Sequence, residues 1–157
     1  MKRLAILGAS GHGKVVAEIA LSSGWNTVEF YDDAFPEKLE LDDFSIKGGF
    51  TSLLAKSDSF DGFHVAIGDN RTRLNIINQL LELDLFCPNI IAPSAVMSKT
   101  ASLGSGISIM ANVVVNAQTV IDDGVILNTS CSVDHDCKIS SGVHVSPGAN
   151  LAGYVSI

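Results

Sequence analysis

The stretch Ala95–Ile157 decides the fold, because it divides into successive blocks of six residues: AVMSKT, ASLGSG, ISIMAN, VVVNAQ, TVIDDG, VILNTS, CSVDHD, CKISSG, VHVSPG, ANLAGY and VSI. The third place of every block is aliphatic: Met97, Leu103, Ile109, Val115, Ile121, Leu127, Val133, Ile139, Val145, Leu151 and Ile157. An α-helix brings together residues three and four apart, so a period of six excludes a helix and favours short strands joined by repeating corners. The stretch is therefore predicted to be a solenoid.

Two further columns of the repeat support this prediction. The first place is small or β-branched throughout: Ala95, Ala101, Ile107, Val113, Thr119, Val125, Cys131, Cys137, Val143, Ala149 and Val155. We expect the first and third places to point inward, and the fourth place mostly holds residues suited to turns, with Met110 as the exception. The pattern resembles the hexapeptide-repeat, left-handed parallel β-helix. That resemblance implies the handedness and three-sided coils in which residues eighteen apart are stacked.

Composition narrows the class of protein. The chain has 157 residues and its pattern changes near Pro93, which predicts two domains, 1–92 and 93–157. The net charge of −7 argues against a nucleic-acid partner, and no apolar stretch is long enough for membrane insertion. Cys87, Cys131 and Cys137 are odd in number, and two of them lie in the inward column. We expect core thiols in a reducing cytoplasm, with no metal bound.

The first ninety residues read as a Rossmann-like α/β unit, in which strands alternate with helices around a parallel sheet. We expect Asn70 to be the N-cap of the second helix and the polar segment 34–59 to be an irregular connection. The predicted elements are strands at Arg3–Leu7, Thr27–Tyr31 and Phe63–Ile67 and helices at Lys14–Ser22 and Arg71–Leu83.

A ligand site is expected at the carboxyl ends of these strands. The turn Gly8-Ala9-Ser10-Gly11-His12-Gly13 lies there, and its free backbone N–H groups at a helix start would bind an anion. Asp32 and Asp33 end the second strand and would accept hydrogen bonds from a ribose or a base. A nucleotide fits both features. The glycine spacing differs from the dinucleotide fingerprint, so an NAD site and a turn without a ligand stay open as alternatives.

Several motifs together resemble the PglD/NeuD family of sugar acyltransferases: Gly8–Gly13, Ile67-Gly-Asp-Asn70 with Arg73, the hexads, Val125–Ser130 and Asp134-His-Asp136. The resemblance implies a Rossmann-like domain that binds a nucleotide-linked sugar, and a β-helix that forms homotrimers and binds acetyl-CoA between subunits. The nucleotide-sugar residues expected on this basis are Gly8, Ser10, Gly11, His12, Gly13, Asp32, Asp33, Gly68, Asn70 and Arg73.

His135 is the candidate general base. It stands directly after the turn residue Asp134, so it should project from a corner, and a neutral imidazole can take a proton from an attacking amine or hydroxyl. Asp136 would orient the ring, although neighbouring residues of a strand face opposite ways, so the pair requires corner geometry. Gly153, one coil further on, is where the resemblance places a backbone donor for the thioester carbonyl. His144 matches a family histidine that contacts acetyl-CoA. A surface histidine without catalytic function is the alternative at both positions.

The expected function is acetyl transfer from acetyl-CoA to an amino group of a nucleotide-linked sugar in bacterial surface glycan synthesis, with a UDP-sugar favoured. Alternatives are O-acetylation of sialic acid or a related sugar, an NAD-dependent dehydrogenase, and an inactive trimeric scaffold that binds a nucleotide sugar. Similar proteins continue for about two more coils, so residues 93–157 are expected to be an incomplete, C-terminally truncated acyltransferase domain. Incubation with acetyl-CoA and a panel of nucleotide-linked amino sugars, with thiol release measured, would be the most informative experiment.

Overall fold

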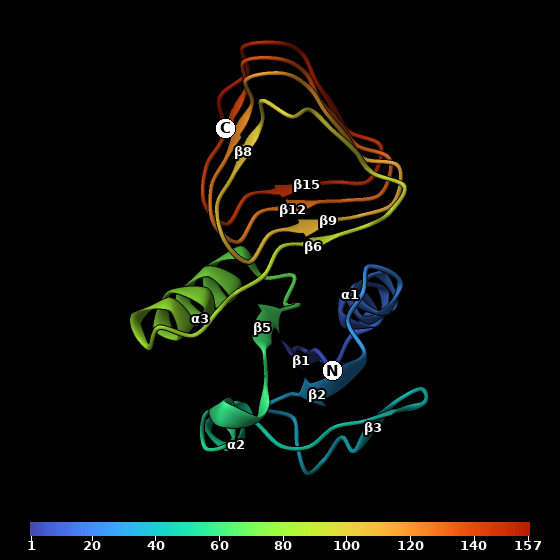
Figure 1. Cartoon of the computed structure of the whole chain (residues 1–157), viewed down its shortest axis with the longest axis vertical. Helices are drawn as coiled ribbons and strands as arrows, with labels where there is room; N and C mark the ends of the chain where they lie inside the picture. The colour runs from blue at the N-terminus through green and yellow to red at the C-terminus, as the bar shows by residue number, and fades with distance from the viewer.

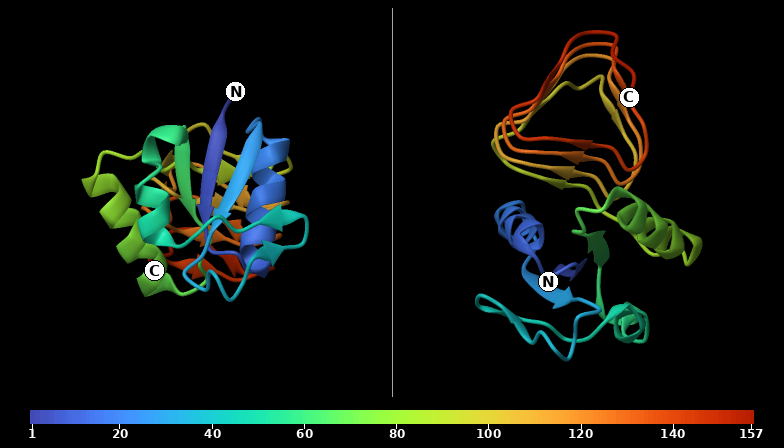
Figure 2. Two further views of the ribbon diagram at one scale, coloured as in Figure 1. Left: turned by 90° about the horizontal axis from the view of Figure 1, so that it is seen from below. Right: turned by 180° about the vertical axis from the view of Figure 1, so that it is seen from behind.

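The computed structural model describes residues 1–157 and contains an α/β domain joined to a triangular solenoid (Figures 1 and 2). Strands β1 (Arg3–Leu7), β2 (Thr27–Tyr31) and β5 (Gly62–Val65) form a parallel sheet in the order β2-β1-β5. Helix α1 (Gly11–Ser22) follows β1 and helix α3 (Asn70–Glu82) follows β5, so the predicted alternation is confirmed. None of the helices is long and apolar enough to cross a membrane.

The continuous apolar run of β1 is explained by burial on both faces of the sheet. Leu4 and Ile6 pack into one hydrophobic cluster, which also contains α1 residues, whereas Ala5 and Leu7 pack into a second one. All four residues are buried. The central strand therefore holds the two sides of the α/β domain together, and its carboxyl end is fixed at the glycine turn.

The prediction of an irregular connection over 34–59 is wrong. Strands β3 (Glu40–Leu41) and β4 (Phe44–Ser45) form an antiparallel hairpin, and α2 (Phe50–Leu54) and the short 3-10 helix η1 (Ser57–Ser59) follow. Their apolar patterns are too short to be detected from periodicity. Tertiary contacts stabilise them: Phe44 packs edge-to-face on Phe30 with ring centroids 5.2 Å apart.

Three predicted boundaries also shift. Helix α1 begins at Gly11 rather than Lys14, and β5 ends at Val65 rather than Ile67. The N-cap of α3 is Asp69 rather than Asn70, because the Asp69 carboxylate accepts a hydrogen bond from Thr72 N at 2.8 Å.

The solenoid consists of two-residue parallel strands stacked in three sheets, the left-handed β-helix predicted for this stretch (Figure 1). Residues eighteen apart pair along each sheet, as Val96 does with Val114 and Val120 with Lys138. The first strand, Ile90–Ile91, lies just before the predicted domain boundary at 92/93 and pairs with β9.

The strands are β6 (Ile90–Ile91), β7 (Val96–Met97), β8 (Ser102–Leu103), β9 (Ser108–Ile109), β10 (Val114–Val115), β11 (Val120–Ile121), β12 (Ile126–Leu127), β13 (Ser132–Val133), β14 (Lys138–Ile139), β15 (His144–Val145) and β16 (Asn150–Leu151). Their sheets are β16-β13-β10-β7, β14-β11-β8 and β15-β12-β9-β6.

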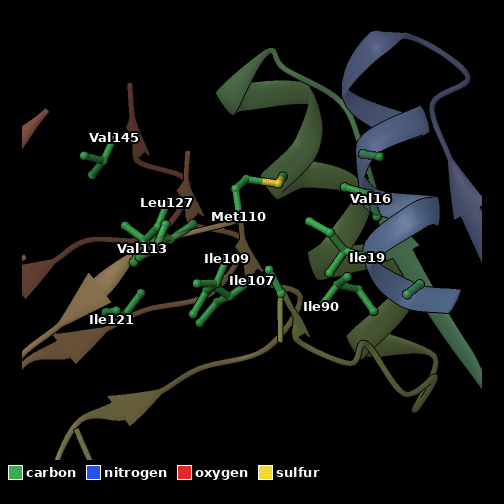
Figure 3. Close-up of a cluster of buried hydrophobic side chains, with 14 of the residues drawn as sticks. Val16, Ile19, Ile90, Ile107, Ile109, Met110, Val113, Ile121, Leu127 and Val145 are labelled. Carbon is green, nitrogen blue, oxygen red and sulfur yellow. The ribbon is translucent and has the colours of Figure 1, made fainter. Parts of the chain in front are cut away.

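The hydrophobic core runs without a break from α1 into the solenoid (Figure 3). Val16 and Ile19 of α1 belong to the same cluster as Ile90, Ile109 and other inward residues. This contact explains Met110, the exception in the fourth column, which is only 1% exposed within that cluster. Burial against the α/β domain permits a large apolar residue at a place where other corners carry turn residues.

The sharpest bend of each corner lies at the sixth place of the block. From Gly106 onward every sixth residue has a positive φ, between 58° and 74°: Gly106, Asn112, Gln118, Gly124, Ser130, Asp136, Gly142, Gly148 and Tyr154. Most of these residues are glycine or short polar residues, which tolerate the left-handed conformation best. These bends interrupt the alternation of side chains that a strand would impose.

Two buried polar side chains join the domains. Arg73 of α3 donates to the carbonyl oxygens of Gly124 and Gly142 at two solenoid corners, both at 2.7 Å. His64 of β5 lies between Pro88 O, 3.1 Å from Nδ1, and Ser108 Oγ, 2.8 Å from Nε2. Because a carbonyl oxygen only accepts, Nδ1 carries the proton and Ser108 donates to Nε2. The α/β domain is therefore fixed against the sheet that contains β9 and β15.

Candidate functional site

His135 and Asp136 meet at the corner between β13 and β14. His135 Nδ1 lies 2.7 Å from Asp136 Oδ2, and both side chains are partly exposed. The φ of 59° at Asp136 turns its side chain out of the strand alternation and brings it to the imidazole of the preceding residue. The corner geometry that this pairing requires is therefore present.

The pair fixes the tautomer of His135. An ionised carboxylate only accepts hydrogen bonds, so Nδ1 carries the proton and Nε2 keeps its lone pair. The backbone N–H of His135 donates to Asp134 Oδ1 at 2.9 Å, which holds the corner from the other side. Nε2 makes no hydrogen bond within the chain and is suited to accept a proton from a nucleophile.

Gly153 lies directly against the His135 ring. A Cβ built at Gly153 would come within 2.7 Å of His135 Cε1 and 2.8 Å of Nε2, so a larger residue would displace the imidazole. The three residues predicted to be catalytic, His135, Asp136 and Gly153, are thus brought together at one corner. Tyr154 also contacts this cluster, with its ring centroid 5.3 Å from that of His135.

His144 lies on β15, on the solenoid face that packs toward the α/β domain. Asn128 Nδ2 is 2.9 Å from His144 Nε2, and Asn128 Oδ1 accepts from Thr129 N at 2.8 Å. The second bond orients the amide, so Asn128 donates to Nε2 and leaves the His144 Nδ1–H as a donor for a ligand. Burial, together with the positive charge of Arg73, lowers the pKa of His144 and favours the neutral ring.

His12 lies close to this region, at the start of α1. Burial lowers its pKa to about 4, and Arg73 and His144 contribute in the same direction. Its Nε2 is buried without a hydrogen-bond partner. His12 and His144 are therefore two neutral imidazoles, each with hydrogen-bonding capacity that no protein group uses.

A cavity of about 300 Å³ lies at the carboxyl ends of the parallel strands. Five of the residues predicted to bind the nucleotide sugar line it: Gly8, Ser10, Asp32, Asp33 and Gly68. The remaining lining residues, which sequence reasoning missed, are Leu7, Tyr31, Ala66, Ile67, Thr72 and Ile76. Leu7, Tyr31, Ala66 and Ile67 could have been found from strand ends alone, whereas Thr72 and Ile76 require the placement of α3 to be known.

The two aspartates of this cavity are partly occupied by the protein itself. Asp32 accepts from Ala9 N at 2.7 Å and from Ala34 N at 2.9 Å, which ties the glycine turn to the end of β2. Asp33 Oδ1 accepts from Phe50 N at 2.8 Å and caps α2, while its Oδ2 has no partner. Lys38 donates to Ala9 O on the same turn. Asp33 therefore retains acceptor capacity for a ligand.

The other predicted nucleotide-sugar residues lie outside the lining. Gly11 begins α1 with nothing within 4 Å of a Cβ added there, so the space beside it is open. Gly13 is buried against the Gly8 carbonyl and allows the helix to pack on the turn. Asn70 accepts a hydrogen bond from Arg73.

Arg73 has a different role from the predicted one. A guanidinium has five N–H groups, and all five are bonded within the protein, while the residue is 0% exposed. Besides the two solenoid carbonyls, Arg73 donates to Ile67 O, Gly68 O and Asn70 Oδ1. It has no donor left for a ligand and acts as an interdomain clamp. Two of the residues it donates to, Ile67 and Gly68, line the cavity.

The corner that carries His135 and Asp136 lies away from the cavity in space. The β15 sheet packs on the α/β domain, and the β13–β14 corner is the apex of the triangle opposite that sheet (Figure 1). His135, Asp136 and Gly153 are accordingly absent from the cavity lining. No group of three or more His, Cys, Asp or Glu side chains is arranged to hold a metal ion.

Comparison with known proteins agrees with this architecture. Residues 3–80 match the PglD N-terminal domain family. The acetyltransferase domain of PglB from Neisseria gonorrhoeae, solved with acetyl coenzyme A, is 39% identical and superimposes with a TM-score of 0.93 over 99% of this chain and 76% of that one. PerB from Caulobacter crescentus, solved with CoA and GDP-perosamine, is 33% identical, with a TM-score of 0.92 over 99% of this chain and 74% of that one.

The fold is that of a hexapeptide-repeat β-helix joined to an N-terminal domain of the PglD type. The chain belongs to the PglD/NeuD family of sugar acyltransferases. A curated relative, the UDP-N-acetylbacillosamine N-acetyltransferase of Bacillus subtilis, is 34% identical over 122 residues, which make up 71% of this chain and 52% of that protein. The chain thus spans about half the length of this relative.

Proposed function

We propose that this protein transfers the acetyl group of acetyl-CoA to an amino group of a nucleotide-linked amino sugar. The observation that carries the proposal is the arrangement of His135, whose Nδ1 faces Asp136 at 2.7 Å while its Nε2 is free. Nε2 takes the proton as the amine attacks the thioester carbonyl, and CoA leaves as the thiol after the tetrahedral state collapses. Asp136 stabilises the imidazolium that forms.

Two further groups complete the proposed chemistry. The backbone N–H of Gly153 stabilises the negative charge on the thioester oxygen, and the glycine leaves room for the imidazole beside it. His144 donates from Nδ1 to the acetyl-CoA arm, because Asn128 occupies its Nε2. The nucleotide sugar occupies the 300 Å³ cavity, with Asp33 Oδ2 as an acceptor. We favour a UDP-sugar, because the curated relative's name specifies one.

The proposed active unit is a homotrimer with each site shared between subunits. His135 lies at the apex of the solenoid opposite the sheet that packs on the α/β domain, and no residue of that corner lines the cavity, which supports a site whose cavity and base come from different subunits. Exposed apolar residues on the free solenoid faces, Val96 and Val120, support an interface there. Ile126, at the same second place of its block, is 0% exposed because it lies on the sheet that faces the α/β domain, so it is not part of that interface. The three buried, unpaired cysteines support a reducing compartment, the cytoplasm.

The proposal is tested by incubating the protein with acetyl-CoA and a panel of UDP- and GDP-linked amino sugars. Thiol release and the mass of the sugar product are both measured. We expect stoichiometric thiol release and addition of one acetyl group to an amino sugar, fastest with a UDP-linked one. The absence of acetylated product across the panel, with acetyl-CoA and a nucleotide sugar both bound, would favour a binding scaffold.

A further inference from the structure

Tyr154 is the one bulky residue among the sixth-place corner residues with positive φ. The other members of that series are Gly106, Asn112, Gln118, Gly124, Ser130, Asp136, Gly142 and Gly148. Tyr154 has a φ of 64°, a conformation in which the Cβ of an L-residue crowds the neighbouring carbonyl. A large side chain held in this conformation costs stability, and such strain is concentrated at functional sites. Glycine or asparagine would form the same corner with less strain.

The ring of Tyr154 contacts the proposed catalytic base. Tyr154 lies eighteen residues after Asp136, so it is stacked one coil above the His135–Asp136 corner. Its ring meets the imidazole edge-to-face, with centroids 5.3 Å apart and an interplanar angle of 90°. Its backbone N–H donates to His135 O at 3.0 Å, which fixes the distance between the two coils. The hydroxyl makes no hydrogen bond within the chain, so the ring provides the contact.

Three groups therefore restrict the His135 ring. Asp136 holds Nδ1, Gly153 of the next coil lies against the Cε1–Nε2 edge, and Tyr154 contacts the imidazole at right angles. Asp136 alone fixes the tautomer but leaves the ring free to tilt about a single hydrogen bond. The Tyr154 ring, itself 75% exposed, stands at one side of the imidazole, where it would limit that tilt.

We propose that Tyr154 is a positioning residue, whose ring holds the His135 imidazole against Gly153 so that Nε2 points to the nucleophile. The inference rests on the proposed acetyl transfer. It accounts for the strained conformation of Tyr154, because only a large ring at this corner reaches the base one coil away.

The test compares Tyr154→Asn and Tyr154→Phe. Asparagine favours the left-handed conformation and removes the ring, so we expect a higher melting temperature together with a kcat lowered about 10-fold, since small misplacement of a base is costly. The KM values for acetyl-CoA and the amino sugar should stay within about twofold of wild type, because Tyr154 contacts the base rather than the substrates. Tyr154→Phe keeps the ring and should retain wild-type kcat.

Gln118→Asn is the matched control. Gln118 occupies the same corner two coils earlier, with a φ of 59°, and makes neither a side-chain hydrogen bond nor a ring contact with His135. This variant should leave kcat unchanged. A wild-type kcat in Tyr154→Asn, or an equal loss in Tyr154→Phe, would overturn the inference.

A measurement without substrates separates this inference from the proposed function. NMR relaxation of the His135 Cε1–H group reports the mobility of the ring on the ps–ns timescale. We expect a rigid ring in wild type and Tyr154→Phe and a mobile ring in Tyr154→Asn. Equal rigidity in all three proteins would contradict the positioning role, whatever reaction the protein catalyses.

Discussion

The His135 Nδ1 and Asp136 Oδ2 atoms lie 2.7 Å apart although the two residues are adjacent in the chain. In a regular strand their side chains would point to opposite faces. The left-handed φ of 59° at Asp136 removes that alternation, so the corner itself creates the pair. Other corners carry glycine, asparagine, serine, glutamine or tyrosine at this place, and only this one combines a carboxylate with a preceding histidine.

Asp136→Asn should lower kcat by about 10-fold, less than loss of the base itself, because the amide oxygen still accepts from Nδ1 but no longer stabilises the imidazolium. Asparagine also tolerates the left-handed conformation, so the melting temperature should not fall. Steady-state kinetics and thermal unfolding of the same preparation check both expectations. A loss as large as that of His135→Ala would mean that Asp136 has more than an orienting role.

Blocking the cavity should abolish binding of the nucleotide sugar without unfolding the protein. Gly68 lines the cavity and a Cβ added there meets nothing within 4 Å, so Gly68→Val fills ligand space only. Gly11→Val should weaken binding similarly if phosphate approaches the start of α1. Calorimetry with a UDP-amino sugar measures the loss, and acetyl-CoA affinity should be unchanged.

Ser22→Val is the control for these two variants. It places the same side chain at the exposed far end of α1, where we expect no effect on binding. Wild-type affinity in Gly68→Val would exclude the cavity as the nucleotide site.

Subunit mixing tests whether the site is shared between chains. His135→Ala retains the cavity and Gly68→Val retains the base, so each variant alone should be nearly inactive. In co-expressed trimers, each shared site takes its cavity and its base from different chains, and about one quarter of the sites should be intact. Mixed protein should therefore recover about one quarter of the wild-type turnover.

The control mixture combines His135→Ala with Asp136→Ala, whose lesions lie at the same corner and cannot complement each other. Absence of recovery in the first mixture would place cavity and base in the same subunit. A monomer at all concentrations in sedimentation velocity would exclude the trimer directly.

The stability of the fold should depend on pH through His64. Burial lowers its pKa from 6.5 to about 4, so between these values the unfolded chain binds more protons than the folded one. The contribution of His64 to the free energy of unfolding should therefore be at its maximum above pH 6.5. It should fall by about 3 kcal/mol as pH decreases toward 4. His12 shifts in the same direction and adds to the slope.

Chemical denaturation at pH 4.5, 5.5 and 7 measures this slope. His64→Gln removes one of the three histidines whose pKa is lowered in the folded protein, so the slope should become clearly smaller. An unchanged slope would mean that His64 is protonated in the folded protein.

The repeat was predictable because a period of six places the same residue type at the same point of each coil. The third-place residues Ile109, Val115 and Ile121 are buried as the column predicts. The α/β strands were predictable for a similar reason, since apolar runs such as Arg3–Leu7 are continuous. The short elements between 34 and 59 were missed because two- to five-residue segments carry no period.

Site residues could be predicted where the residue type and its place in the repeat indicate the chemistry. They could not be predicted where the role of a residue depends on its contacts in the folded chain. His135 and Asp136 follow from a corner in the repeat. Arg73 appears in the sequence as a cation near a ligand site, yet its five donors are all satisfied across the domain interface. Tyr154 carries no sequence signal, because its importance depends on the coil stacked beneath it.

The most direct test of the account is the turnover of His135→Ala with saturating acetyl-CoA and a UDP-linked amino sugar. Because His135 Nε2 is the one free ring nitrogen at the proposed site of attack, kcat should fall by on the order of 100-fold or more. The affinities for both substrates should change little, as the imidazole acts mainly in the transition state. Near wild-type turnover in His135→Ala would contradict the assignment of the base and the mechanism built on it.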